Sequence, residues 1–260
     1  MPRYFIEVAY KGTRYAGFQK QDNANTIQAE LEKALAIYFR VPFDLTGSSR
    51  TDAGVHARQN FFHFDTESIT PGADLNKAVY HLNAILPPDI VVRRIFKVGA
   101  QAHCRFDALY RIYEYRIYQL KDPFLQDDAY HYPYRVNRDI LINSARELLN
   151  HTDFESFAKR NSQVFTHNCT IIRSEWRFDG DVLIYKVQAN RFLRGMVKGL
   201  VGTMLKAATK GYSAEEFRAI ILGKNPSRAE FAVPSQGLTL IQVGYPVVNE
   251  EQNAPRETSS

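Results

Sequence analysis

Hydrophobic and polar residues alternate along residues 3–10 (RYFIEVAY), which predicts a first β-strand. After a glycine-punctuated loop, apolar residues recur at helical spacing, with Asn25 as the expected N-cap and Gln28 at the capping-box position. The rest of the first half predicts strands near 42–49 and 59–66, a helix near 73–85 that ends before two prolines, and a strand at 89–98. This order of elements is typical of an α+β fold.

The second half begins with a long strand-like segment at 104–120 (CRFDALYRIYEYRIYQL). Arg111, Tyr113 and Tyr115 share one side of it, because residues two apart lie on the same face of a strand. The pattern then predicts a helix at 137–149, strands at 170–180 and 181–192, helices near 192–209 and 213–223, and a last strand near 237–245. The polar tail, residues 247–260, is expected to be disordered.

Composition narrows the class of protein. The chain has 260 residues, 45% of them hydrophobic and 23% charged, which is enough for one large or two small globular domains. Its 33 Lys and Arg against 28 Asp and Glu favour a polyanionic partner without requiring one. Two cysteines are too few for a disulfide scaffold. Since no export signal or membrane-spanning segment is evident, we expect a soluble cytoplasmic protein.

The segment at 47–59 (GSSRTDAGVHARQ) interrupts both periodicities and places Asp52 between Arg50 and His56. Arg50 could keep the carboxylate ionised by pairing with it, and Gly54 permits a backbone shape that other residues resist. Flanking strands would hold the loop rigid, which suits a nucleophile or a base. An aspartate in a loop is more often a turn former that bonds its own backbone, and spacing alone favours that structural interpretation.

The predicted helix from Arg191 has a continuous apolar face, and Arg191, Arg194 and Lys198 fall on a stripe beside that face. Cations that border a buried face often line a cleft, but they also extend from the edge of a core into solvent, and the pattern fits both. Tyr113 is equally ambiguous. A tyrosine in a sheet is more often a packing residue than a surface on which a base stacks.

No motif for a metal or a nucleotide cofactor is found in the sequence. His56, His63, His103 and Cys104 match no CxxC, HExxH or three-ligand spacing, so we predict no metal. The phosphate-binding patterns GxxxxGK[ST] and GxGxxG do not occur, which removes the commonest reasons to expect a bound nucleotide cofactor. An aspartic protease would need a second DAG-like loop, and the chain has only one.

Taken together, five parts of the chain resemble the tRNA pseudouridine synthase A family, from Tyr4 to Tyr245. The most specific is RTDAGVHA at 50–57. The others are YKGTRYAGFQKQ followed by TIQAELEKAL, then RIYEYRIY, NRFLRGMVKGLVG and GLTL, in this order. The match reaches candidate site residues, so it carries more than an analogy of folds.

The resemblance implies roles for the matched residues. Asp52 corresponds to the family's catalytic aspartate, the nucleophile toward the target uridine. Arg50 corresponds to an arginine that pairs with this aspartate and helps to displace the base, and Tyr113 to a tyrosine that packs on the flipped uracil. Lys198 stands where the family commonly has a basic residue, often arginine. We expect three further residues to contact RNA: Arg111, Arg191 and Arg194.

The family also implies a reaction and an architecture. The reaction isomerises uridine to pseudouridine at positions 38 to 40 of the tRNA anticodon stem-loop, and it needs no cofactor because the product is an isomer of the substrate. The expected fold is α+β, with two similar ferredoxin-like subdomains, residues 1–108 and 109–246. They would form one continuous mixed, mainly antiparallel sheet flanked by helices, with the catalytic cleft between them. A homodimer is also implied.

Two other functions fit parts of the sequence. An RNA-binding protein of the same shape that had lost its chemistry would keep the basic residues but change Asp52 or Tyr113, and both are present. A carboxylate-based nucleoside hydrolase would release free base instead of retaining it. Measuring hydrogen release from C5 of uridine together with free uracil separates the three functions.

Overall fold

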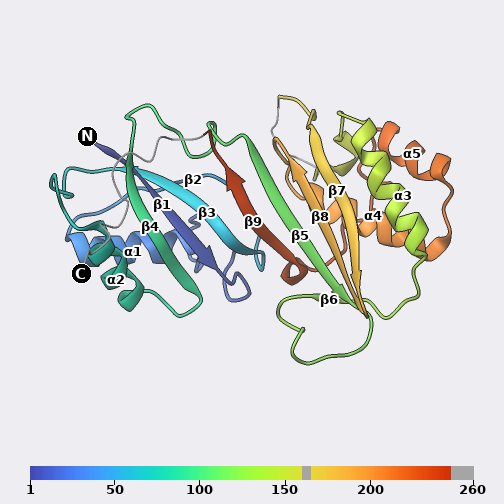
Figure 1. Cartoon of the computed structure of the whole chain (residues 1–260), viewed down its shortest axis with the longest axis horizontal. Coiled ribbons are helices and arrows are strands. Elements are labelled where there is room, and N and C mark those ends of the chain that lie inside the picture. The colour runs from blue at the N-terminus through green and yellow to red at the C-terminus, as the bar shows by residue number, and fades with distance from the viewer. Residues whose placement is uncertain (160–164, 247–260) are drawn as a thin grey trace, which may run out of the picture.

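The computed structural model of the protein describes residues 1–159 and 165–246, and its centre is one large sheet (Figure 1). The strands are β1 Arg3–Tyr10, β2 Thr46–Gly47, β3 His56–Asp65, β4 Ile90–Val98, β5 Tyr110–Tyr118, β6 Tyr130–His131, β7 Ile171–Asp179, β8 Val182–Ala189 and β9 Leu238–Gly244. The helices are α1 Ile27–Phe39, α2 Leu75–Ile85, α3 Arg138–Glu147, α4 Met196–Lys210 and α5 Ala214–Leu222, with short 3₁₀ turns η1 Leu148–Asn150, η2 Glu155–Phe157 and η3 Ser235–Gly237.

The order of the strands brings the end of the chain to the middle of the sheet. Along the sheet the order is β4-β1-β3-β9-β5-β8-β7, while β2 pairs with β3 and β6 with β5. The pairs β3–β9 and β5–β6 are parallel and the others are antiparallel. A mixed, mainly antiparallel sheet flanked by helices confirms the predicted fold class. β9 aligns Leu240 with Ala57 on one side and with Tyr113 on the other.

Two hydrophobic clusters lie on either side of β9. One joins β1, β3 and β4 with α1 and α2, and the other joins β5, β7 and β8 with α3, α4 and α5 (Figure 1). Each cluster also contains a residue from the other half of the chain. Val55 from the first half lies in the second cluster, and Leu240 from β9 lies in the first. Tyr113 packs against both. The division into residues 1–108 and 109–246 stays a prediction.

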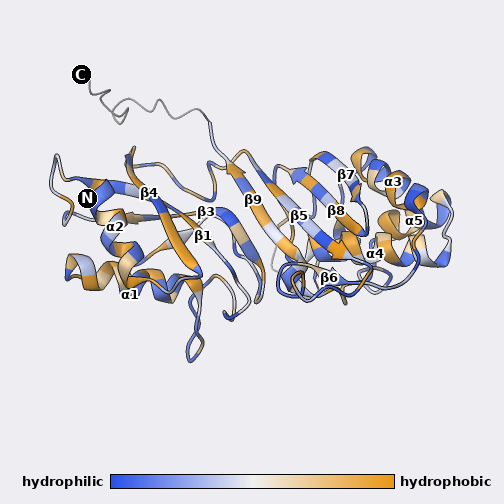
Figure 2. Ribbon diagram, turned by 60° about the horizontal axis from the view of Figure 1, so that its bottom comes forward, coloured by the Kyte–Doolittle hydropathy of each residue, from blue (hydrophilic) through white to orange (hydrophobic). Residues whose placement is uncertain are grey.

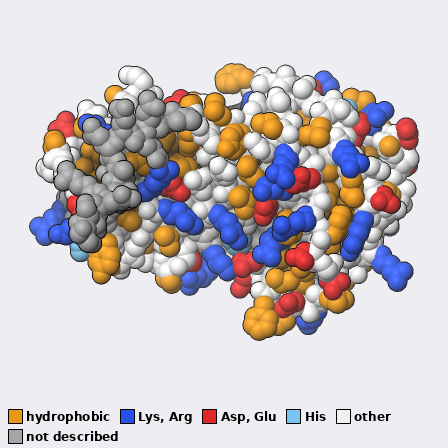
Figure 3. All heavy atoms as spheres, viewed as in Figure 1, with side chains coloured by type: hydrophobic (Ala, Val, Ile, Leu, Met, Phe, Trp, Pro, Cys, Tyr) orange, Lys and Arg blue, Asp and Glu red, His pale blue; other side chains and the backbone are white. Residues whose placement is uncertain are grey.

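The two faces of β5 differ in polarity, as Figure 2 shows by the alternating colours along β5 and β8. Tyr115 and Ile117 are fully buried, whereas Glu114 and Arg116 are half-buried. On the face drawn in Figure 3, Lys and Arg side chains gather across the middle, with Asp and Glu side chains among them. Pairs such as Lys186 with Glu114 on neighbouring strands, 3.4 Å apart, balance charge on the sheet.

Two predictions for the first half need correction. The N-cap of α1 is Thr26, not Asn25, and the Thr26 hydroxyl accepts a hydrogen bond from the Ala29 N–H. Of the strand predicted at 42–49, only Thr46–Gly47 forms. The backbone at Leu45 is bonded instead by side chains of α1, because Glu32 accepts from its N–H and Gln28 donates to its carbonyl.

Two elements of the second half begin later than predicted. Helix α4 starts at Met196 and not near residue 192, because Gly195 before it has a left-handed backbone (φ +74°) that does not continue a helix. Strand β5 starts at Tyr110, since residues 103–107 form a turn in which the Asp107 N–H donates to the His103 carbonyl.

No helix within residues 1–159 and 165–246 is long and apolar enough to cross a membrane. The disorder expected for 247–260 concerns residues outside those that the structure describes.

Candidate active site

Asp52 lies in an irregular loop between β2 and β3 whose backbone is held at several points. The Phe18 N–H donates to the Thr51 carbonyl at 3.1 Å, and the Val55 N–H donates to the Asp52 carbonyl at 3.2 Å. The Thr51 hydroxyl lies 2.8 Å from that of Tyr10, which is fully enclosed in the first cluster. These contacts fix the loop through its main chain and leave the Asp52 carboxylate unused.

Two glycines allow a neighbouring loop to pack directly on the Asp52 loop. A Cβ added at Gly12 would lie 2.0 Å from the Val55 carbonyl oxygen, and one at Gly17 (φ +112°) would lie 3.2 Å from the Thr51 carbonyl oxygen. The Gly12 N–H also donates to Nδ1 of His56 at 3.0 Å. The glycine-punctuated segment of the sequence therefore serves as a close backbone support for the loop.

The Asp52 carboxylate has no hydrogen bond or salt bridge to any residue in the described parts of the chain. The structural interpretation, in which the side chain bonds its own backbone in a turn, is therefore not what the geometry supports. The carboxylate is half-buried, so it is neither sealed in the core nor fully in solvent. An ionisable group left unpaired at such a place is available to a ligand.

Tyr113 and Lys198 come close enough to Asp52 for their ionisation to respond to its charge. Burial raises the pKa of Tyr113 to about 12, and the Asp52 charge adds to this increase while Arg111 opposes it. Burial lowers the pKa of Lys198, and the Asp52 charge opposes this decrease. The structure thus brings together a carboxylate, a phenol and an ammonium group from a loop, a strand and a helix.

The second half of the chain also contacts the Asp52 loop directly. Lys198 on α4 donates from Nζ to the hydroxyl of Ser235 at 3.3 Å. The Ser235 Cβ lies against Gly54, where an added Cβ would be 3.2 Å away. The ring of Tyr113 packs edge-on against Phe192, with centroids 5.1 Å apart. The candidate site therefore lies at the junction of the two halves.

Arg50 does not pair with Asp52, contrary to the ion pair expected from the sequence. No salt bridge joins these side chains in the part of the chain that the structure describes, and Arg50 is exposed. It lines a cavity of about 370 Å³ together with Gly47, His103 and Arg105. Arg50 therefore lies at the border of this cavity and does not hold Asp52 in this structure.

Arg111 uses its guanidinium inside the protein. Nη1 donates to the carbonyls of Ala108 and Asn190, and Nη2 donates to those of Ser48 and Arg105 at 3.4 and 2.8 Å. These bonds join three chain segments behind the site, so the geometry gives Arg111 main-chain partners in place of the RNA phosphates expected for it. A guanidinium bonded to four carbonyls has little donor capacity left.

Arg191 and Arg194 lie in the connection that precedes α4, so the helical stripe predicted for them with Lys198 is wrong. Arg194 is exposed and Arg191 is half-buried. A residue that the sequence reasoning missed, Arg105, lies near Arg50 and Arg191. Partial burial together with these two cations lowers the pKa of Arg105. The sequence pattern did not point to Arg105, because this residue lies within segment 104–120, which was predicted to be a strand.

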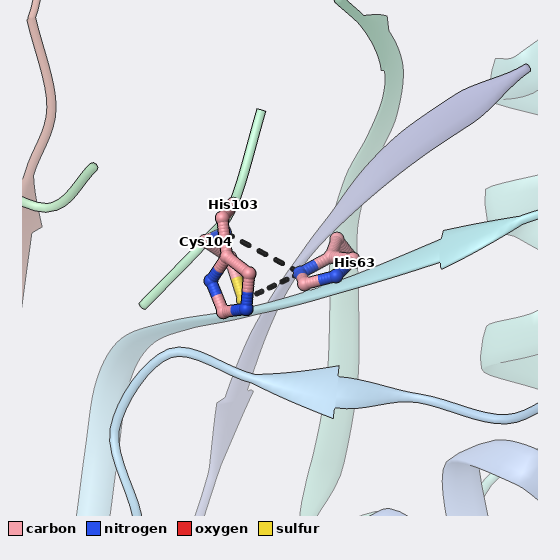
Figure 4. Close-up of side chains that lie close together, drawn as sticks. All are labelled: His63, His103 and Cys104. Atoms are coloured by element: carbon pink, nitrogen blue, oxygen red, sulfur yellow. Dashed lines mark hydrogen bonds between the residues drawn. The ribbon is translucent and has the colours of Figure 1, made fainter. Parts of the chain in front are cut away.

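Within residues 1–159 and 165–246, two groups of side chains have possible metal-ligand atoms within 4.8 Å of one another. They are His63, His103 and Cys104, and Asp153, Glu155 and His167. Figure 4 shows the first group, in which the Cys104 sulfur lies 3.1 Å from Nδ1 of His63. Burial raises the pKa of Cys104 to about 12 and lowers that of His63 to about 4, so both are neutral near pH 7. The expectation of no metal stays a prediction.

Comparison with known proteins places the chain in a family. A family model described as tRNA pseudouridine synthase matches residues 6–107 and 145–246. The chain belongs to this family. Asp52 and Lys198 lie in the matched segments, and Tyr113 lies between them.

Curated relatives match nearly the whole chain. The tRNA pseudouridine synthase A of Parabacteroides distasonis is 40% identical over 246 residues, which cover 95% of this chain and 97% of that protein. The protein of the same name from Bacteroides fragilis is 39% identical over 94% of this chain and 96% of its own. That from Anoxybacillus flavithermus is 37% identical over 94% of this chain and 99% of its own.

Proposed function

We propose that this protein isomerises uridine to pseudouridine in tRNA, with Asp52 as the nucleophile. The observation that carries the proposal is the Asp52 carboxylate, which is unpaired within the described residues and lies near Tyr113 and Lys198. Its relatives named tRNA pseudouridine synthase A support the reaction and the substrate.

In the proposed reaction, the main task of the protein is to hold the Asp52 carboxylate and the target base in position. The bond between C1′ of the ribose and N1 of uracil breaks, the base turns, and a bond forms between C1′ and C5. The C5 hydrogen leaves as a proton, and N1 is protonated. Asp52 forms a covalent bond to the substrate that lets the base detach without leaving the site, and this bond breaks again before the product leaves. Both events require an ionised carboxylate held in one place. The glycine-supported loop supplies that placement.

Tyr113 and the nearby cations have separate tasks in this proposal. A base must leave its stack to reach Asp52, which costs a few kcal/mol, and stacking against the ring of Tyr113 offsets part of that cost. With its pKa raised to about 12, the Tyr113 phenol is protonated near pH 7, so its O–H is available as a hydrogen-bond donor to the base. Arg50, Arg191, Arg194 and Lys198 would attract phosphates.

The finer details follow the family resemblance. We propose the anticodon stem-loop as the target, with uridines 38 to 40 modified, and recognition through RNA shape and phosphates because one enzyme accepts several positions. We also propose that two copies of the chain assemble as a homodimer, that the enzyme acts in the cytoplasm, and that residues 1–108 and 109–246 are its subdomains.

The decisive experiment uses a tRNA transcript with tritium at C5 of uridine. We expect the wild-type protein to release tritium without free uracil. Asp52→Asn should slow this release by at least about 1,000-fold, because the amide is not a nucleophile, and should change tRNA affinity only a few-fold. Asp179→Asn, at an exposed strand end, is the matched control and should retain full activity.

Each alternative function has its own result. Free uracil in the assay would indicate a nucleoside hydrolase, and tRNA binding with neither product would indicate an RNA-binding protein without chemistry. An Asp52→Asn protein that turns over at the wild-type rate would remove Asp52 from the mechanism.

A further inference from the structure

The cavity beside the Asp52 loop has a basic and aromatic lining, of which the proposed function uses only Arg50. It has a volume of about 370 Å³ and lies between residues 44–47 and residues 103–106, with Arg50 at its border. Phe18 forms one wall, and its close contact with Gly47, where a Cβ would lie 2.0 Å from the ring, leaves no room for a side chain at 47. The cavity is a formed feature of the fold and takes its shape from buried contacts.

Two cations of the cavity lining, Arg50 and Arg105, and the nearby Arg191 lack acidic partners in the described part of the chain. The side chains of Arg50, Arg105 and Arg191 make no salt bridge and no hydrogen bond among residues 1–159 and 165–246. They are close enough for Arg50 and Arg191 to disfavour the charge on Arg105. Asp44 is the acidic residue among those that line the cavity, and it is exposed. Clustered guanidinium groups that pair with no carboxylate favour an anion, and guanidinium binds phosphate through paired hydrogen bonds.

An exposed aromatic ring stands beside these cations. Phe106 is 75% exposed, although a large apolar side chain is normally covered. The turn that carries it is well ordered, because Nδ1 of His103 accepts hydrogen bonds from the N–H groups of both Arg105 and Phe106. The His103 ring packs on Phe106 with centroids 4.2 Å apart. The Arg105 guanidinium lies 5.8 Å from the centroid of the same ring. The aromatic ring is therefore held in one orientation while most of its surface stays exposed.

The base of this turn is anchored in the first half of the sheet. Cys104 is fully buried, and its thiol donates to the Thr46 carbonyl at 3.1 Å and lies against His63 of β3 (Figure 4). Arg111 binds the Arg105 carbonyl from the other side at 2.8 Å. A turn fixed at both ends that presents an exposed ring and a cation without an acidic partner among the described residues is preorganised for binding.

We propose that Arg50, Arg105 and Phe106 form a nucleotide subsite that takes a nucleotide neighbouring the target uridine. Its phosphate would lie between the two guanidinium groups, and its base would stack on Phe106. Arg50 stands two residues from Asp52, so the Cα atoms of these residues are at most about 7 Å apart. This inference rests on the proposed function, because it identifies a second part of the same RNA substrate.

Binding measurements with paired changes in the protein and the RNA test the subsite. A tRNA transcript is compared with transcripts that each lack one base next to the target uridine. Loss of a stacked base contact should make Phe106→Ala bind the intact transcript about 10-fold more weakly. Phe106→Tyr keeps the ring and should bind like the wild type. Phe124→Ala is the control, because Phe124 is 91% exposed outside the cavity and should not affect affinity.

The proposal requires that the effect of Phe106→Ala depend on the presence of one particular base of the RNA. With the base missing there, Phe106→Ala should cause no further loss, whereas with any other base missing the 10-fold loss should remain. Arg105→Gln should weaken binding of all these transcripts alike and reduce the salt dependence of the affinity.

Phe106→Ala binding as tightly as Phe124→Ala, or losing affinity equally with every transcript, would overturn the subsite. The tritium assay is read separately: wild-type protein that binds the transcript but forms no pseudouridine would refute the proposed function, while the coupling still reports on the subsite.

Discussion

The two halves of the molecule contribute to the candidate site in different ways. The first half provides Asp52 on a loop without regular structure, positioned by main-chain bonds and by contact with Gly12 and Gly17. The second half provides Tyr113 and Lys198 on a strand and a helix, whose positions follow from sheet register and helix packing. A loop can leave a carboxylate unpaired and accessible, but its precision then depends on a few backbone contacts.

Among variants that leave Asp52 itself unchanged, the largest expected effect comes from breaking that backbone support. Gly12→Ala places a methyl group against the Val55 carbonyl, so the loop must shift, and we expect the free energy of unfolding to fall by about 1–3 kcal/mol. A displacement on the order of 1 Å at Asp52 would slow tritium release by about 100-fold. Urea unfolding and the tritium assay measure the two effects.

The matched control is Gly99→Ala. Nothing lies within 4 Å of a Cβ at Gly99, so this variant should retain both stability and activity. If Gly12→Ala matched Gly99→Ala in both assays, the backbone contact would not position Asp52.

Sequence patterns predicted regular elements better than the connections between them. The alternation in β1 and the helical patterns near 73–85 and 213–223 are local properties, so β1, α2 and α5 were predicted to within a few residues. The strand predicted at 42–49 failed because its backbone is bonded by side chains of α1, a contact that no local pattern records.

The same distinction applies to the site. The family resemblance, not periodicity, brought Asp52, Tyr113 and Lys198 together. The partners of Arg111 come from three separate segments, and the missing pair between Arg50 and Asp52 depends on loop conformation. Arg105 and Phe106 looked like strand residues because the alternation of β5 extends past the point where the strand begins.

We expect acid to lower the free energy of unfolding through groups in the two halves over different pH ranges. In the first half, burial and then His103 and Arg3 lower the pKa of His63 to about 4 from its usual 6.5. The unfolded chain thus binds a proton between these values that the folded chain does not, so stability falls as the pH drops from 6.5 toward 4. We expect a loss of about 2 kcal/mol between pH 7 and pH 5, measured by urea unfolding.

A variant from each half tests which group causes this loss of stability. His63→Gln should remove most of the decrease between pH 7 and pH 5. In the second half, Arg218 holds the pKa of Glu147 at about 2, so its contribution is lost only as the pH falls from 4.5 toward 2. Glu147→Gln should therefore keep the decrease between pH 7 and pH 5. The reverse result would place the acid-sensitive group in the second half.

The smallest expected effect is a difference in salt slope between variants of two cations in the second half, Arg191 and Lys198. Arg191 has no acidic partner among the described residues, so Arg191→Gln should weaken tRNA binding by several-fold and reduce the salt slope of the affinity by about 1. The Asp52 carboxylate partly offsets the positive charge of Lys198, so Lys198→Gln should reduce the salt slope by less. Arg177→Gln, on an exposed position of β7, should change neither. Equal slopes for Lys198→Gln and Arg191→Gln would mean that Asp52 does not offset the Lys198 charge, and the electrostatic link between the halves would be absent.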